Sequence, residues 1–545
     1  MTSPAGRSHP PRPRQPRPGQ PRSGQPRSGQ PGNSQPRSGQ PRSGQPRSGQ
    51  ERSGQERGDR THADPARRAA YDVLRAVEDR DAYANLLLPS VLRERGLTGR
   101  DAAFATELTY GTLRGRGTYD AILAACSDRD ELDPPVRDVL RLGVHQLLAT
   151  RVGSHAAVAT SVDLTKDVCG PRPSGFVNAV LRRVATRDLE AWIDIVVPDR
   201  SQDPSGYLAV RYSHPRWIVD AYRAALGEAG RAGLARSEAA RAGTAHAGGA
   251  RSETEEALAA GNVRPDVVLA LRAPDSPDAV LPQAAGERTR WSPYGFRLAA
   301  GDPAPLVASG QAAVQDEASQ LAALALTRVG LSGSDRLWLD LCAGPGGKSG
   351  VLAGLAAQRG ARLVASDVRP NRASRVLAAL RRIPRNAPGG APGPDETADH
   401  DYGVIAADGR RVPWAPGTFD RVLADVPCSG LGSLRRRPEA RWRKTPQDVT
   451  RLAGLQRDLL NAAIDSARPG GVVAYVTCSP HLAETRDVVC SVAESRTDIT
   501  LLDAPAVLAE VPGLRGADPG YPRFAQFWPH RHNTDAIFLA LLRRG

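Results

Sequence analysis

Two cysteines in the last third of the chain stand where a thiol can act as a nucleophile. Cys428 ends the segment Asp425-Val426-Pro427-Cys428, and Cys478 lies between Thr477 and Ser479. Each segment follows a short apolar run, which predicts a buried parallel strand that ends in a loop. Because an open α/β sheet binds its ligands at the carboxyl ends of its strands, we expect both thiols at one site.

A glycine-rich turn upstream of these cysteines predicts a cofactor at the same edge of the sheet. The turn follows the apolar segment 337–341 and leads into a helical pattern. Its residues are Cys342, Ala343, Gly344, Pro345, Gly346, Gly347 and Lys348. Glycine lets the backbone approach a ligand closely at the start of a helix. The turn matches neither a Walker A loop nor the dinucleotide-binding fingerprint.

Two carboxylates at the ends of the next two strands indicate which cofactor the turn binds. Asp367 ends the second predicted strand, where a carboxylate grips ribose hydroxyls. Asp408 follows the third, where it is placed to accept a hydrogen bond from an adenine amino group. A ribose and an adenine without a diphosphate cradle fit S-adenosylmethionine better than NAD. We expect no metal in this site.

A methyl sulfonium beside two thiols indicates methylation of cytosine at C5. That carbon is a poor nucleophile, but a thiolate that adds to C6 turns the ring into an enamine whose C5 attacks the methyl group. Asp425, three residues before Cys428, is placed to protonate N3. After transfer, C5 must lose a proton and the thiolate must leave, which explains a second thiol. This chemistry does not decide whether Cys428 or Cys478 attacks.

The chain carries an excess of positive charge, which predicts a polyanionic partner. Its 545 residues have a formal net charge of +14, of which residues 1–60, with 12 arginines and 3 acidic residues, contribute +9. The repeated Arg-Ser-Gly-Gln-Pro units of residues 1–62 have almost nothing to bury and predict a disordered basic tail. Six cysteines without close pairs, and no signal peptide or membrane span, predict a reduced, cytoplasmic protein.

The remaining chain divides into three predicted domains. Residues 63–195 show helical spacing at 66–95, 101–119, 134–150, 155–168 and 175–186, after the N-cap pair Asp64-Pro65, and predict an all-α domain. Residues 205–305 predict a small α+β linker domain with a short helical stretch opening at 212–217, strands at 265–272 and 295–298, and an unstructured insertion within 226–261.

Residues 306–545 alternate between strand and helix patterns and predict a doubly wound parallel sheet. The expected strands are 336–341, 362–366, 403–406, 421–424 and 472–476, with helices at 348–359 and 371–382. Segment 383–402, rich in Pro, Gly and Asp, predicts a disordered loop. Segments 524–529 and 535–542 predict a terminal antiparallel hairpin.

A basic stretch directly after Cys428 favours RNA as the substrate. We expect its charges to face the mouth of the site, where arginine contacts phosphates and tryptophan stacks on a base. The alternative is a solvated surface. The candidate residues are Arg435, Arg436, Arg437, Arg441, Trp442, Arg443 and Lys444.

Segments 107–114, 141–148 and 176–183 resemble the NusB antitermination fold, an RNA-binding helical bundle. On this resemblance Asn178 and Arg182 are candidate RNA contacts, with a capped, solvated helix face as the alternative. Segments 342–348, 425–430 and 477–479 resemble the motifs of RNA 5-methylcytosine methyltransferases.

Taken together, residues 63–545 resemble the RsmB/Sun (Fmu) small-subunit (16S) rRNA enzymes. The resemblance implies a NusB-like RNA-binding domain, a small linker domain and an α/β Rossmann-like class I methyltransferase domain. It implies that Cys478 is the nucleophile and that Cys428 assists product release. The residues that it implies bind S-adenosyl-L-methionine are 342–348, Asp367, Asp408, Asp425 and Arg372. Members of the family more often have Ala where this chain has Gly344, and usually Ala at Val426, and neither change removes a functional side chain.

Two other functions compete with this interpretation. The same reaction on tRNA is disfavoured only by the NusB-like domain. An RNA-binding assembly factor or antiterminator with an inert methyltransferase domain is disfavoured by the intact Cys428, Cys478, Asp425 and glycine turn. We expect a cytoplasmic monomer that acts on small-subunit ribosomal RNA and does not bind membranes.

Overall fold

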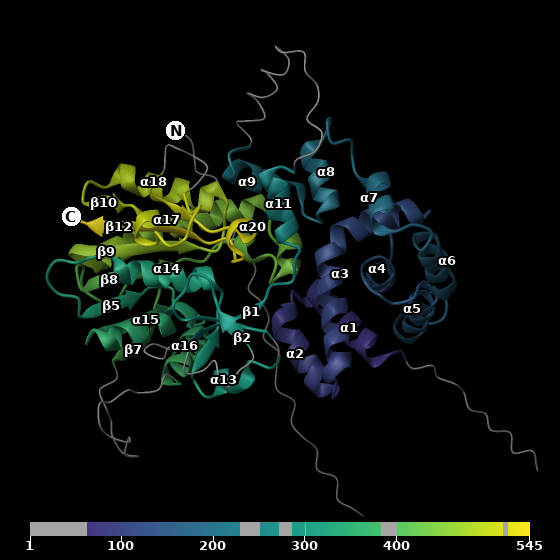
Figure 1. Cartoon of the computed structure of the whole chain (residues 1–545), viewed down its shortest axis with the longest axis horizontal. Coiled ribbons are helices and arrows are strands. Elements are labelled where there is room, and N and C mark those ends of the chain that lie inside the picture. Colours follow the sequence, from purple (N-terminus) through teal and green to yellow (C-terminus); the bar gives the residue numbers. More distant parts are fainter. Residues whose placement is uncertain (1–62, 229–250, 272–285, 300, 383–400, 516–521) are drawn as a thin grey trace, which may run out of the picture. The chain divides into compact units, whose positions relative to one another are not determined.

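The computed structural model describes residues 63–228, 251–271, 286–299, 301–382, 401–515 and 522–545 (Figure 1). The predicted basic tail, most of the predicted insertion and almost all of the predicted loop 383–402 lie outside these residues. Within the described part, no helix is both long and apolar enough to cross a membrane.

Helices alone make up the N-terminal part of the described chain, as predicted. They are α1 (Pro65–Arg80), α2 (Ala84–Glu94), α3 (Gly99–Cys126), α4 (Pro134–Ala149), α5 (Ser154–Cys169), α6 (Ser174–Val184) and α7 (Leu189–Val196). Helix α4 contacts α1, α3, α5 and α6, and residues 138–146 are buried on all sides. A helix buried all round is the core of a bundle rather than a surface helix.

The predicted helix at 66–95 is wrong in one respect, because the chain breaks there into α1 and α2. Asp81 takes the left-handed conformation with φ of 51° and its N–H bonds to the carbonyl of Ala76, which ends α1. Aspartate adopts this conformation at lower cost than most residues. The predicted start is confirmed, since the side chain of Asp64 accepts a 2.9 Å hydrogen bond from the N–H of Arg67.

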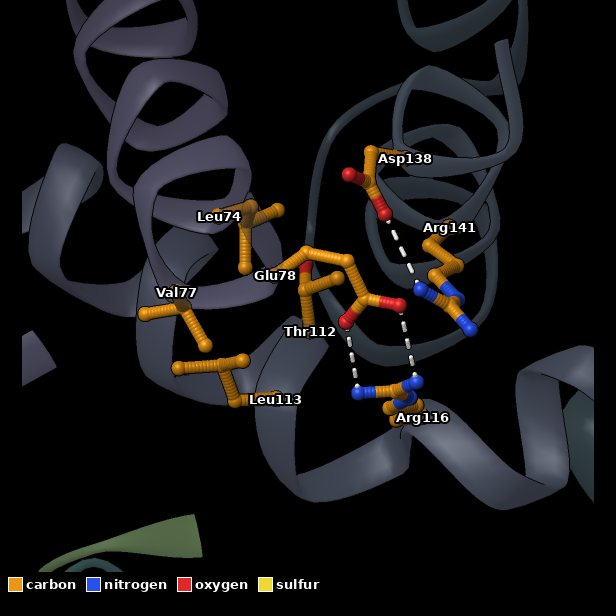
Figure 2. Close-up of a pocket in the computed structure, with 8 residues that line it drawn as sticks. All are labelled: Leu74, Val77, Glu78, Thr112, Leu113, Arg116, Asp138 and Arg141. Carbon is orange, nitrogen blue, oxygen red and sulfur yellow. Dashed lines mark hydrogen bonds and ion pairs between the residues drawn. The ribbon is translucent and has the colours of Figure 1, made fainter. Parts of the chain in front are cut away.

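A small pocket between α1, α3 and α4 is lined by acidic and basic side chains that form ion pairs with one another (Figure 2). Glu78 accepts from both terminal nitrogens of Arg116, at 3.0 and 3.2 Å. Asp138 accepts from Arg141 at 2.9 Å. The pocket is therefore a polar seam of the bundle, and we assign it no chemistry.

The linker region follows with α8 (Pro204–Arg211), α9 (Arg216–Ala225) and α11 (Glu253–Ala260), then a small antiparallel sheet in the order β2-β3-β1-β4. Its strands are β1 (Val267–Leu271), β2 (Gly286–Arg288), β3 (Gly295–Leu298) and β4 (Ala312–Val314). Strands β1 and β3 confirm the prediction. Part of the predicted unstructured insertion is helical, because Ser252 caps α11 by accepting from the N–H of Glu255. Strand β4 lies beyond the predicted boundary at 305, yet pairs with β1.

The C-terminal part is a mixed sheet with the order β10-β12-β9-β8-β5-β6-β7. Five adjacent strands, which end at the edge strand β7, are parallel, and all five were predicted: β5 (Leu337–Asp340), β6 (Arg362–Asp367), β7 (Tyr402–Ala406), β8 (Phe419–Asp425) and β9 (Ala467–Thr477). Strands β10 (Ile499–Leu502) and β12 (Phe538–Arg544) run antiparallel at one edge. Strand β11 (Ala525–Gln526) pairs with β12, which confirms the predicted hairpin. The predicted parallel sheet with a terminal antiparallel hairpin is thus confirmed, and only β10 was missed.

Helices cover both faces of this sheet (Figure 1). Helices α14 (Glu317–Arg328), α15 (Gly347–Gln358) and α16 (Pro370–Arg381) share one apolar core, while α17 (Pro446–Ser466) and α18 (Arg486–Ser495) share the other. The short elements are α13 (Ala304–Ala308), η2 (Leu431–Ser433), η3 (Pro438–Trp442), η4 (Leu482–Glu484), α19 (Ala504–Val507) and α20 (Pro529–His532).

Most of the basic stretch after Cys428 bonds to protein groups, so the prediction that its charges face the mouth of the site is wrong for four arginines. Arg435 and Arg436 form ion pairs of 2.8–3.1 Å with the buried carboxylates of Asp316 and Asp535. Arg443 donates to the carbonyl of Val77 at 2.8 Å and to those of Asp81 and Ala82.

Arg441 is fully buried, and its guanidinium joins three separate parts of the chain. It donates to the carbonyls of Arg114 at 3.2 Å, Ser213 at 3.1 Å and Gly261 at 3.0 Å. Burial lowers the pKa of Arg441 to about 9, which still leaves it charged at neutral pH. Trp442 packs on α3, where a Cβ at Gly117 would lie 2.6 Å from the indole. The connection from β8 to α17, residues 427–445, is thus fastened to the helical bundle.

Replacing Arg441 tests this attachment. We expect Arg441→Ala to lose about 3 kcal/mol or more of stability, because it leaves a cavity and removes the donor from the buried carbonyls of Ser213 and Gly261. Thermal unfolding measured by circular dichroism gives the change. Arg451→Ala is the control, since its side chain is 78% exposed on α17 and, among the described residues, pairs with nearby Asp448. Equal melting temperatures for both variants would show that Arg441 does not hold the parts together.

Candidate active site

Four loops converge at the carboxyl edge of the parallel strands, as the sequence predicts. Strand β5 pairs with β6 on one side and β8 on the other, and β8 pairs with β9. Their loops carry the glycine turn 342–348 after β5, Asp367 at the end of β6, Asp425 and Cys428 after β8, and Cys478 after β9. The sheet therefore brings residues more than one hundred positions apart to one place.

The two thiols are in direct contact. Sγ of Cys428 lies 3.1 Å from Sγ of Cys478, and both side chains are half-buried. In the parallel register Asp425 lies beside Val476, so the strand ends are level and both loops leave the sheet together. The N–H of Gly432 also donates to the carbonyl of Cys478 at 2.9 Å, which holds the first loop against the second.

Their surroundings make the two thiols chemically different. The hydrogen bond with Cys428 lowers the pKa of Cys478, against burial and the charge of Asp425, and the nearby cations of Lys348 and Arg437 lower it further. The same hydrogen bond, together with burial, raises the pKa of Cys428 well above its ordinary value. The cations near Cys478 thus favour ionisation of Cys478 over that of Cys428. Since the thiolate is the nucleophile, these pKa directions favour Cys478 for attack.

A partly buried ion pair joins the glycine turn to the end of β8. Nζ of Lys348 donates to Oδ2 of Asp425 at 2.7 Å. Burial alone lowers the pKa of Lys348, but Asp425, Cys478 and Asp340 together raise it above its ordinary value. The lysine is thus a charged partner of Asp425 that also favours the Cys478 thiolate.

The glycine turn has no room for side chains where it meets the next strand. A Cβ at Gly344 would lie 2.4 Å from Oδ2 of Asp367 and 2.6 Å from Nε of Arg372. Gly346 takes φ of 109° at the N-cap of α15, a conformation that favours glycine. A side chain at position 344 would therefore require the side chains of Asp367 and Arg372 to move.

Asp367 and Arg372 are brought to the turn as predicted. Oδ2 of Asp367 accepts from the N–H of Gly344 at 3.1 Å and pairs with Nε of Arg372 at 3.3 Å. Oδ1 accepts from the N–H of Arg369 at 2.9 Å. Arg372 also donates to the carbonyl of Gly344. A carboxylate has about four acceptor positions, so Asp367 keeps capacity for a ribose hydroxyl.

Asp408 has a different environment from the other predicted cofactor residues. It follows β7, the strand beside β6, but is bound by the guanidinium of Arg410, with Oδ2 2.6 Å from Nη2. These hydrogen bonds lower the pKa of Asp408 to about 2. A cofactor that used Asp408 would have to share it with Arg410.

Sequence reasoning missed buried polar groups around the turn. Asp340 ends β5, and its Oδ2 accepts from Oγ of Ser349 at 2.7 Å. Burial raises the pKa of Asp340 to about 7, against that hydrogen bond. Oδ1 of Asp340, Oγ of Ser366 and the side-chain amide of Gln315 are buried without hydrogen-bond partners in the described structure. The sequence could have indicated Asp340, because it ends a predicted strand just as Asp367 does.

The predicted RNA contacts that remain on the surface are few. Arg437 is exposed, and its guanidinium lies 5.8 Å from the ring of Tyr83 at the start of α2. Lys444 is half-buried. Arg182 is exposed on α6 and donates to Oδ1 of Asn178 at 3.2 Å. Among the described residues, no group of three or more His, Cys, Asp or Glu side chains is arranged to hold a metal.

Two family models match the chain. Residues 330–543 match the 16S rRNA methyltransferase RsmB/F model, and residues 64–186 match the NusB family. A Mycobacterium tuberculosis protein named as a methyltransferase is 47% identical over 490 residues, or 89% of this chain and 98% of that protein. The ribosomal RNA small subunit methyltransferase B of Pseudomonas putida is 31% identical over 466 residues, or 83% and 91%.

A solved structure shares the fold. The crystal structure of PH0851 matches with a TM-score of 0.66 at 20% identity, and the match covers 88% of this chain and 98% of that one.

The asymmetry between the thiols predicts their order of labelling. Iodoacetamide at neutral pH should alkylate Cys478 before Cys428, because the pKa of Cys478 is lowered and that of Cys428 is raised. Peptide mass spectrometry across a pH series gives each rate. In Cys428→Ala, the Cys478 profile should move to higher pH, whereas Cys169→Ala, a half-buried thiol of α5, should leave it unchanged. Faster labelling of Cys428 would reverse the assignment.

Proposed function

The chain belongs to the RsmB/F family of 16S rRNA methyltransferases, and from this premise we propose that it transfers a methyl group from S-adenosyl-L-methionine to C5 of a cytosine in small-subunit ribosomal RNA. The observation that carries the proposal is the contact between Cys428 and Cys478, two thiols whose pKa values move in opposite directions. An ionised thiol beside a protonated one suits a reaction that begins with nucleophilic addition and ends with release.

The side chains around the glycine turn fit the methyl donor. S-adenosyl-L-methionine, when bound, supplies an electrophilic methyl group. The residues proposed to hold it are the turn 342–348, Asp367, Asp425 and Arg372, with Asp408 at the outer end of the site. The unpartnered buried atoms of Asp340, Ser366 and Gln315 support this assignment, because buried polar groups in folded proteins have partners. The lack of space for a Cβ at Gly344 supports a turn built for close backbone approach.

Cys478 is proposed to open the reaction on the base. Its thiolate adds to C6, and the electron pair of the C5–C6 bond moves into the ring toward N3, where a proton neutralises it. Asp425 is the proposed contact of N3. Its 2.7 Å ion pair with Lys348 supports this role, because it fixes the carboxylate and keeps the ammonium, a proton source, against it. The resulting enamine makes C5 nucleophilic.

Cys428 is proposed to act at the end of the reaction. Once C5 carries the methyl group, its proton passes to solvent water, the C5–H electron pair restores the C5–C6 double bond, and the bond between C6 and Sγ of Cys478 breaks with its electron pair returning to sulfur. Cys428 lies 3.1 Å from that sulfur and can donate a hydrogen bond to the departing thiolate. Its protonated state supports assistance in release rather than attack.

RNA as the substrate is supported by the family and by surface charge near the thiols. The hydrogen bond with Cys428 lowers the pKa of Cys478 most, and the charge of the exposed Arg437 lowers it further. The guanidinium of Arg437 also lies over the exposed ring of Tyr83. An arginine and an aromatic ring together suit a phosphate and an unstacked base. Arg182 and Asn178 on the helical bundle are the proposed distal contacts.

Methyl donor binding is tested at Asp367. We expect Asp367→Ala to weaken S-adenosyl-L-methionine binding by about 1–3 kcal/mol, the usual cost of losing a hydrogen bond to a charged group. Isothermal calorimetry gives the affinity without RNA. Asp401→Ala is the control, because Asp401 is exposed just before β7. Unchanged affinity in Asp367→Ala would remove this carboxylate from the cofactor site.

The covalent mechanism is tested by the two cysteines separately. We expect Cys478→Ala to abolish methyl transfer, because no thiolate adds to C6. Cys428→Ala should form the adduct and transfer the methyl group, then stall, and so accumulate a protein–RNA complex that survives denaturing electrophoresis. The assay is run at alkaline pH, because the loss of Cys428 also raises the pKa of Cys478. The double variant should trap nothing.

Bisulfite mapping of ribosomal RNA completes this test. Cells that lack the protein should lose one protected cytosine in the small-subunit RNA, and wild type but not Cys478→Ala should restore it. A trapped complex in Cys478→Ala would reverse the two roles. Full activity in both single variants would overturn the covalent mechanism.

A further inference from the structure

A buried carboxylate lies behind the two thiols, on the residue Glu484 of η4. Its side chain is fully buried. Oε1 accepts from the N–H of Ser429 at 2.7 Å, and Oε2 accepts from Oγ of Ser479 at 2.7 Å and from Oγ of Ser429. Ser429 follows Cys428 and Ser479 follows Cys478, so one carboxylate binds the residue next to each thiol.

Other contacts fix this carboxylate in place. The hydroxyl of Tyr475 on β9 donates to the carbonyl of Glu484 at 2.8 Å. Gln456 of α17 donates to Oε1 of Glu484 at 3.2 Å and to the carbonyl of Pro427 at 2.9 Å. The sheet and α17 therefore hold Glu484, and Glu484 in turn holds the two loops.

We propose that Glu484 is the positioning residue of the thiol pair, whose carboxylate ties the Cys428 loop to the Cys478 loop through Ser429 and Ser479 and so keeps the two sulfurs in contact. The catalytic meaning of this contact rests on the proposed function. Glu484 touches neither sulfur in the described structure. It acts through the two serines.

The cost of burying a carboxylate supports a specific role. An unpaired buried charge is expensive, and the group is tolerated only where hydrogen bonds satisfy it. Here four donors from three segments converge on two oxygens, a set that an apolar side chain of the same size would leave without acceptors. The direct oxygen contact of Ser429 with Ser479, at 3.2 Å, shows how closely the loops are drawn together.

A positioning role and a purely electrostatic role of Glu484 predict opposite shifts in the pH at which the thiols ionise when Glu484 is replaced by glutamine. The hydrogen bond with Cys478 and burial raise the pKa of Cys428 most, and the charge of Glu484 adds to that rise. If only this charge mattered, its removal would move thiol ionisation to lower pH. If Glu484 holds the sulfurs in contact, its loss weakens the hydrogen bond that lowers the pKa of Cys478. Labelling of Cys478 then moves to higher pH.

The experiment is peptide-resolved alkylation of Cys478 with iodoacetamide across a pH series. In Glu484→Gln we expect the labelling profile of Cys478 to move upward toward that of Cys428→Ala. Labelling near neutral pH should slow about tenfold for every pH unit by which the profile moves. Adding Glu484→Gln to Cys428→Ala should move the profile no further, because the contact is already lost. Glu494→Gln, an exposed residue of α18, is the matched control.

A second variant covers the case in which Glu484→Gln does not fold. Ser429→Ala combined with Ser479→Ala removes the hydroxyl bonds and leaves the carboxylate, and should move the profile in the same direction. A profile that stays in place or moves to lower pH in these variants overturns the proposal. Because labelling needs neither RNA nor methyl donor, this result is independent of whether the wild-type protein methylates ribosomal RNA.

Discussion

The contact between two sulfurs is the constraint on which the site depends. Two thiols 3.1 Å apart interact so that the pKa of Cys478 is lowered and that of Cys428 is raised. Two thiols in identical surroundings would have equal pKa values. The parallel pairing of β8 with β9 brings the loops together, the Lys348 and Arg437 charges favour the Cys478 thiolate, and Glu484 lies behind both loops. Strand register and one buried carboxylate thus set the distance between the two sulfurs, and local charge sets which thiol has the lower pKa.

The connection from β8 to α17 has a second attachment, to the helical bundle. Its arginines are used as hydrogen-bond donors to backbone carbonyls and as partners of buried carboxylates. Arginine suits this use because its planar group offers five donors in a fixed geometry. A run of arginines beside an active site is therefore a weak sign of nucleic-acid contact when the same arginines also join several parts of the protein.

What the sequence predicts well is what depends on local pattern. The five parallel strands and the helices between them follow from apolar runs, and the meeting of Cys428 with Cys478 follows from the rule that strand ends converge. What it misses depends on distant contacts. Arg441 bonds to a carbonyl 327 positions away, and Glu484 reaches Ser429 across 55 positions. No spacing in the sequence marks such pairs, because the fold alone brings them together. The break at Asp81 did have a local signal, since the charged residues 78–81 interrupt the apolar spacing.

These attachments favour a preformed site over a mobile lid. Segment 427–445 begins beside the thiols and ends at Thr445, which caps α17 and shares a capping box with Asp448. Lifting the segment would strip the Arg441 donor from the buried carbonyls of Ser213 and Gly261, at about 1–3 kcal/mol for each orphaned group, and would expose the ion pairs of Arg435. A base inside folded RNA would reach such a site by leaving its stack, which does not require the segment to lift. If the proposed function holds, the rigidity that keeps the two sulfurs in contact predicts that the conformational change takes place in the RNA.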